Sequence, residues 1–318
     1  MDDREYDKTH YVNIIIGIAV IVIVASRLTY IGNKNYTDNL MAIGISLLFT
    51  AEGHLCQINC RLSYIKEFVI RRVLFFASFF LTGLIVDYIC SDAAKDGMRV
   101  EFSDILSDKY MLIPGLIVCV VCYRLLRSRL NIAVTLILCM AISVGGQLYS
   151  QNKINDIVSL ILREFGYMLY IALGEAACAI YEKNEKLKMF FIVLSICLIE
   201  GGAVIITYTS IPIVPFAMIC VGLSIMCKWI EVFTVIEKCG EHWLLIWGSS
   251  LMLGIMDLAM RFDSYIFKMT NHNFISHFLS TVLLICCEML FIWIFEIIVK
   301  IRKKGVKGAD ITKQKGTE

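Results

Sequence analysis

The stretch between residues 11 and 55 decides the fold. It reads YVNIIIGIAVIVIVASRLTYI over residues 11–31 and LMAIGISLLFTAEGHL over residues 40–55, with a polar turn at Gly32–Asn39 between them. A helix crosses the apolar core of a bilayer with about twenty residues. The first segment has that length and carries no charge before Arg27. The stretch therefore predicts a pair of membrane-spanning helices joined by a short turn.

The whole composition extends this interpretation. The 318 residues are 58% hydrophobic with only three prolines, and the mean hydropathy is +0.73. Soluble domains are about half apolar, so the excess is typical of a polytopic membrane protein. Every backbone polar group in lipid must be satisfied within its own segment, so we expect an all-α bundle of about ten transmembrane helices. The expected spans are 11–31, 40–55, 67–90, 111–126, 130–149, 157–181, 189–208, 211–228, 243–260 and 275–299.

Lysine and arginine placement predicts the orientation of these spans. With the N-terminus inside, 21 of the 30 basic residues fall on the inner side and seven on the outer side. Cytoplasmic connections carry such an excess, so both termini are predicted inside a cell membrane. The chain then divides into a cytoplasmic N-terminus (1–10), one membrane domain (11–300) and a basic cytoplasmic tail (301–318), whose composition is typical of disorder.

Two classes of site are disfavoured. Most of the 13 cysteines lie within apolar runs, where they act as small hydrophobic residues. Cys56 and Cys60, and Cys119 and Cys122, have loose metal-like spacing without a second Cys or His pair at a matching distance, so no metal site is expected. Basic residues are spread over the connections without interleaved aromatic residues, which disfavours nucleic-acid binding.

The same N-terminal pair resembles the opening helices of the acyltransferase-3 family of membrane acyltransferases. IGIAVIVIVASR (residues 16–27) is similar to the family's first helix, which reads Arg-Gly-(Ile/Leu)-Ala, an apolar run and then His. GISLLFTAEG (residues 44–53) is similar to the second helix, Gly-Val-Asp-Leu-Phe-Phe-x-(Leu)-Ser-Gly. YIKEFVIRRV (64–73), FGYMLYIALG (165–174) and IEKCGEHWLLIW (236–247) resemble later motifs in the same order.

The resemblance implies transfer of an acyl group from acyl-CoA to a hydroxyl of a cell-envelope glycan or lipid-linked sugar, with no bound cofactor. The family's Arg and His fall on Ile16 and Arg27, so both are replaced. Arginine stays protonated and cannot act as the base. Catalytic activity is therefore left open. The alternative is a non-catalytic membrane component that binds or transports a small molecule, as the similar membrane half of VanT-type serine racemases suggests.

Four residues are candidates for the acyl-transfer site. Glu52 and His54 are the acid and base candidates, although their i, i+2 spacing points them to different faces of a helix. Arg71 and Arg72 stand where a nucleotide-linked acyl donor would arrive, and guanidinium groups suit phosphate. Their other interpretation is anchoring to anionic lipid headgroups.

Three further ionisable residues fall inside expected spans. Arg27 either reaches the outer headgroups or pairs with a carboxylate such as Glu164, Glu200 or Asp257. Glu164 and Glu175 are eleven residues apart, which predicts that both lie on one face of the expected span 157–181. Ionisable residues at such depth are candidates for a functional site, and structural pairing is the alternative.

Overall fold

The computed structural model of the chain is all-helical over the residues that it describes, with no strand among them. These residues are 3–28, 34–58, 69–70, 72–74, 77, 108–152, 157–208, 212–229, 234–249, 253–271, 275–290, 292–294 and 297. The all-α prediction is therefore confirmed. The basic tail, Arg71, and most of the expected third span lie outside the described residues.

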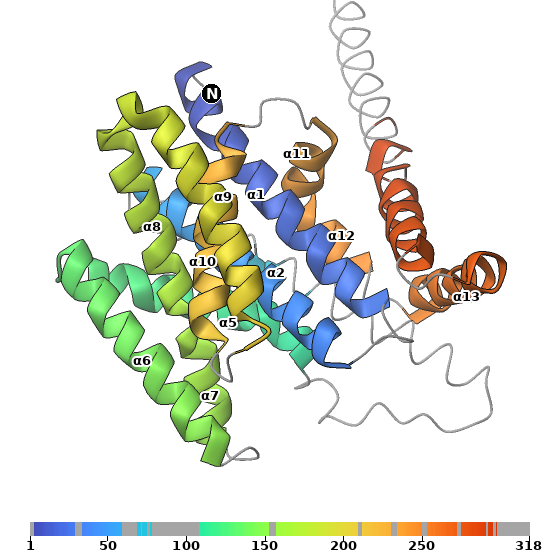
Figure 1. Ribbon diagram of the computed structural model, residues 1–318, viewed down its shortest axis with the longest axis horizontal. Helices are drawn as coiled ribbons and strands as arrows, with labels where there is room; N and C mark the ends of the chain where they lie inside the picture. The colour runs from blue at the N-terminus through green and yellow to red at the C-terminus, as the bar shows by residue number, and fades with distance from the viewer. Residues whose placement is uncertain are drawn as a thin grey trace, which may run out of the picture.

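Figure 1 gives the arrangement of the helices. They are α1 (Asp3–Leu28), α2 (Lys34–Ile58), α5 (Asp108–Arg127), α6 (Ile132–Asn152), α7 (Ile157–Gly166), α8 (Met168–Lys183), α9 (Lys188–Ile205), α10 (Ile213–Cys227), α11 (Thr234–Glu241), α12 (Trp243–Ser249) and α13 (Leu253–Thr270), with a 3-10 turn at Glu185–Leu187. A further helix begins at residue 275 and lies beside α13 (Figure 1).

Four of the described helical segments are long and apolar enough to cross a membrane: Asp38–Ile58, Ile132–Tyr149, Lys188–Ile205 and Ile275–Ile294. The first has 61% of its span buried in the protein, whereas the segment in α9 has 17%. The exposed face of α9 is apolar and includes Met189, Phe190 and Val193. A soluble protein rarely exposes such a face, so it fits a helix that contacts lipid. In this arrangement α2 is central and α9 peripheral.

Glycines lie where the most closely packed helices cross. A Cβ on Gly53 of α2 would meet the backbone of Ile171, and one on Gly174 of α8 would meet Thr50, both closer than real Cβ atoms come. In the same way, a Cβ on Gly17 of α1 would meet the backbone of Ile236 in α11, and one on Gly240 of α11 would meet the backbone of Asn13 in α1. Small residues let helix backbones approach in an apolar environment, where helices gain little from hydrophobic burial against one another. The glycines thus allow backbone contact between α2 and α8 and between α1 and α11.

Several expected boundaries were wrong, and three of them show why. Residues 34–39 continue α2, so the polar turn is shorter than Gly32–Asn39. The expected span 157–181 consists of two helices, which a tight turn at Tyr167 separates. The first helix ends at Gly166, and glycine is a weak helix former. α13 runs on to Thr270 where a loop was expected, and it ends at Asn271, whose φ of 51° is a left-handed C-terminal cap. A helix keeps its backbone bonded after it leaves an apolar layer, so hydropathy alone places its ends poorly.

Candidate functional site

Buried ionisable residues gather at the end of the bundle where α1 begins, which we call the proximal end. Here Tyr11 of α1 contacts His54 near the end of α2 and Cys178 near the end of α8. Lys228, directly after α10, has its Nζ 5.2 Å from the centroid of the Tyr11 ring. α1 therefore begins where α2, α8 and α10 end.

Glu52 forms a buried ion pair with Arg72. The Glu52 side chain is 1% exposed, and the Arg72 guanidinium lies 5.4 Å from the centroid of the Trp243 ring at the start of α12. Burying a charge is costly unless it is paired, so the two residues stabilise each other and hold this part of the chain on α2. In this state Arg72 is occupied by a carboxylate, and the donor-binding role of Arg71 and Arg72 stays a prediction.

His54 contacts different residues from Glu52, as the i, i+2 spacing predicts. Its Nδ1 lies 3.2 Å from the Tyr11 hydroxyl, which in turn lies 3.4 Å from the Cys178 sulfur. The imidazole is buried, and its Nε2 has no hydrogen-bond partner among the described residues. This ring is held in place on one nitrogen and could act as a base through the other. Within the described part of the chain, no three His, Cys, Asp or Glu side chains converge as a metal site would need.

Glu175 and Glu164 both lie against α5. Tyr123 donates a 2.6 Å hydrogen bond to Glu175, and the Nε of Arg127 donates one of 2.8 Å. The Glu164 carboxylate lies over Gly115 of the same helix, where a Cβ would come within 2.7 Å of its Oε2. Both side chains thus face α5, although the turn at Tyr167 divides the single helix on which the prediction placed them.

The side chains of Arg27 and of Asp257, one of its three predicted partners, lie outside the described residues. Glu200 is exposed on α9. The pairing of Arg27 with Glu164 therefore stays a prediction.

A pocket of about 250 Å³ lies at the other end, which we call the distal end. Its distance from the proximal end can be read along α2. Ser46, which lines the pocket, lies eight residues before His54, a separation of about 12 Å along the helix. Helices α2, α6, α7, α8 and α10 all contribute to the wall. The lining residues are Ala42, Ser46, Ser143, Gln147, Leu162, Gly166, Tyr167, Tyr170, Pro212, Ile213 and Phe216.

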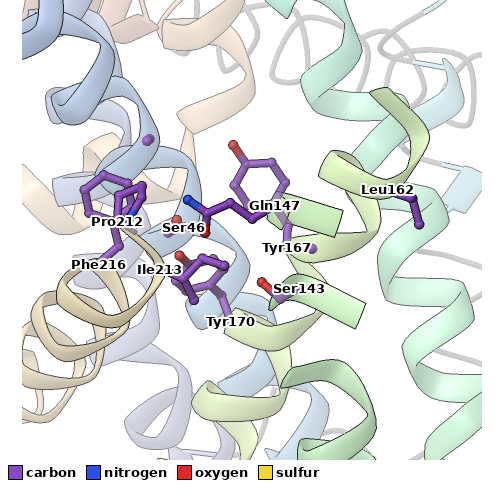
Figure 2. Close-up of a pocket in the computed structure, with 11 residues that line it drawn as sticks. Ser46, Ser143, Gln147, Leu162, Tyr167, Tyr170, Pro212, Ile213 and Phe216 are labelled. Atoms are coloured by element: carbon purple, nitrogen blue, oxygen red, sulfur yellow. The ribbon is translucent and has the colours of Figure 1, made fainter. Parts of the chain in front are cut away.

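The pocket joins a polar side to an apolar side. Figure 2 shows Gln147, Ser46 and Tyr170 around the same space, with Pro212 and Phe216 to one side. The Tyr167 ring is fixed by stacking on Phe49 of α2 at a centroid distance of 5.0 Å. Ligand sites are concave and mostly apolar with a few placed polar groups, and this pocket has that form.

Sequence reasoning missed every residue of this pocket. Its polar members come from three separate segments, so no single local spacing marks the whole set, and uncharged Ser, Gln and Tyr in apolar runs resemble ordinary interior residues. Tyr11, Tyr123 and Arg127 were also missed as partners of the buried acids and histidine. A search for polar residues at matched depth in neighbouring spans could have found Tyr123 and Arg127.

Comparison of the chain with protein-family models, with curated proteins and with solved structures found no match. The resemblance to the acyltransferase-3 family therefore stays a prediction from the sequence.

Proposed function

We propose that the chain is an integral membrane protein of ten spans that binds a small molecule in its distal pocket. The single observation that carries the binding proposal is a pocket walled by five helices in a bundle in which several helix pairs approach to backbone contact. The buried charged residues at the proximal end are engaged with one another, whereas the pocket presents groups that are free of charge. Binding or transport of a small molecule uses such a pocket directly.

Basic residues at the proximal end support placing that end, where α1 begins, on the inner side. The start of α1 contacts the ends of α2, α8 and α10 there, as expected if α1 crosses the membrane in the opposite direction to these three helices. Arg72, Arg124, Arg127 and Lys228 all lie toward that end, and an excess of basic residues is typical of the cytoplasmic side. On this orientation the pocket lies in the outer half of the membrane domain.

A screen of small molecules by thermal unfolding tests the binding proposal. The full chain in lipid nanodiscs is compared with Ala42→Leu, which fills the pocket, and with Ala203→Leu on the exposed face of α9 as the matched control. We expect at least one compound to stabilise the wild type and the Ala203→Leu variant but not Ala42→Leu. Equal stabilisation of all three by every active compound, or no active compound, would contradict the proposal.

Acyl transfer is the second candidate, and the observation that favours it is His54. The imidazole is buried and contacts Tyr11 through Nδ1, while its Nε2 has no hydrogen-bond partner among the described residues. It has the form of a general base if Nδ1 carries the proton and a substrate hydroxyl reaches Nε2. An acyl-CoA such as acetyl-CoA would supply the acyl group, and a hydroxyl of a cell-envelope glycan or lipid-linked sugar would accept it. Hydrolysis of acetyl-CoA that is lost in His54→Gln but kept in His242→Gln would establish this candidate; no turnover in the wild type would remove it.

A further inference from the structure

The described polar groups that line the distal pocket are all uncharged. They are the hydroxyls of Ser46 and Ser143, the phenols of Tyr167 and Tyr170 and the amide of Gln147. We infer that the pocket takes a small uncharged molecule that has one apolar face and several hydroxyl or amide groups. This inference rests on the proposed function and adds the chemical class of the ligand.

A charged ligand would find no counter-charge there among the described residues. The acids nearest along the chain are turned elsewhere: Glu164 of α7 lies over Gly115 of α5, and Glu175 of α8 bonds to Tyr123 and Arg127. Asp38, one turn before Ala42 on α2, is exposed and does not line the pocket. Transferring an unpaired charge from water to such a site is strongly unfavourable, so an ion would bind far more weakly than a neutral molecule of the same shape.

The hydrogen-bonding capacity of the wall fits hydroxyl and amide groups. Serine and tyrosine hydroxyls both donate and accept, and the glutamine amide has one oxygen that accepts and two N–H groups that donate. Ser46 is 1% exposed and Tyr170 is 4% exposed, so these groups would bind a ligand out of competition with bulk water.

The apolar lining residues and the volume of the pocket favour a small ligand with an apolar face. Ile213 and Phe216 of α10, with Pro212 before it, add apolar side chains to the lining. Figure 2 shows Pro212 and Phe216 to one side of the pocket. At about 250 Å³ the pocket is smaller than the roughly 300 to 1,000 Å³ of sites for drug-sized ligands. The stack of Tyr167 on Phe49 keeps the polar wall in place. The ligand is therefore compact as well as neutral.

Matched neutral and charged probes test the inference on the full chain in nanodiscs. The pairs are benzamide with benzoate, nicotinamide with nicotinate, glucose with glucuronate, and benzyl alcohol with benzylamine, each titrated by thermal unfolding against wild type and Ala42→Leu. We expect neutral members to stabilise the wild type at concentrations at least about tenfold lower than their charged partners, with no such effect in Ala42→Leu. Charged members that act equally well through the pocket would overturn the inference and leave the proposed function standing. No pocket-dependent effect from any pair would overturn both.

A charge placed in the pocket gives a second, independent test. Gln147→Glu introduces a carboxylate into the lining, and Thr207→Glu introduces one at an exposed position after α9 as the control. We expect Gln147→Glu to favour benzylamine over benzyl alcohol, whereas the wild type and Thr207→Glu favour the alcohol. An unchanged preference in Gln147→Glu would show that Gln147 does not face the ligand and would overturn the assignment of this wall.

Discussion

Gly53 of α2 and Gly174 of α8 face each other across the centre of the bundle, each against the other helix's backbone. Gly53 lies over the carbonyl of Ile171, and Gly174 lies over that of Thr50. The crossing sits between the buried polar residues of the proximal end and the pocket of the distal end, since His54 follows Gly53 and Tyr170 precedes Gly174 on the two helices. A change in this crossing would therefore disturb both ends.

The first prediction concerns that crossing. Gly174→Ala and Gly53→Ala should each lower the free energy of unfolding by about 1 to 3 kcal/mol or more, because a backbone atom cannot move aside for the added methyl group. Gly145→Ala is the matched control, since a Cβ there meets nothing within 4 Å. It should be neutral or raise stability by up to about 1 kcal/mol through helix propensity. Unfolding in detergent measures all three, and equal effects would contradict the close approach.

The second prediction is that Glu52 and Arg72 depend on each other. Glu52→Gln or Arg72→Met alone should cost about 3 to 5 kcal/mol, because the remaining partner is left buried and uncompensated. The double variant should lose much less than the sum of the two. A double-mutant cycle by unfolding in detergent gives the coupling energy, with Lys238→Met at an exposed site of α11 as a control. Additive losses would mean that Glu52 and Arg72 do not interact and would contradict the prediction.

The third prediction concerns Glu175 and its partners on α5. Tyr123→Phe removes a buried hydrogen bond to a carboxylate and should cost about 1.5 to 3 kcal/mol. Tyr265→Phe, which alters an exposed tyrosine of α13, should leave stability nearly unchanged. The Glu175→Gln background should reduce the effect of Tyr123→Phe, because the neutral amide accepts a weaker hydrogen bond. The same loss of stability in both backgrounds would show that Tyr123 does not act through Glu175, which would contradict the prediction.

The helical class was predictable because it follows from composition. Long apolar runs leave the backbone no other way to satisfy its hydrogen bonds in lipid, and the residues from 11 to 55 already carry that signal. Helix ends were less predictable: α2 begins in the polar residues that resembled a turn, and the break at Tyr167 interrupts an apolar run. Both depend on contacts with other helices that hydropathy does not contain.

The candidate site was predictable only where charge marked it. Glu52, Glu175 and His54 stand out as ionisable residues in apolar surroundings, and each is buried in a specific contact. Which partner each one meets depends on helices far apart in the sequence, as with Tyr11 and His54. Ser46 and Gln147 carry no such mark. Their meeting in one pocket is a product of the packing of α2 and α6.

The most direct measurement of the central claim is a cryo-electron microscopy structure of the full chain in a lipid nanodisc, with the compound that most stabilises the wild type but not Ala42→Leu. Our account predicts ligand density at the distal end, within hydrogen-bonding distance of Ser46, Gln147 or Tyr170 and against Phe216. Density at the proximal end beside His54, with the distal pocket closed or filled by side chains, would contradict it and make the buried imidazole the site of function.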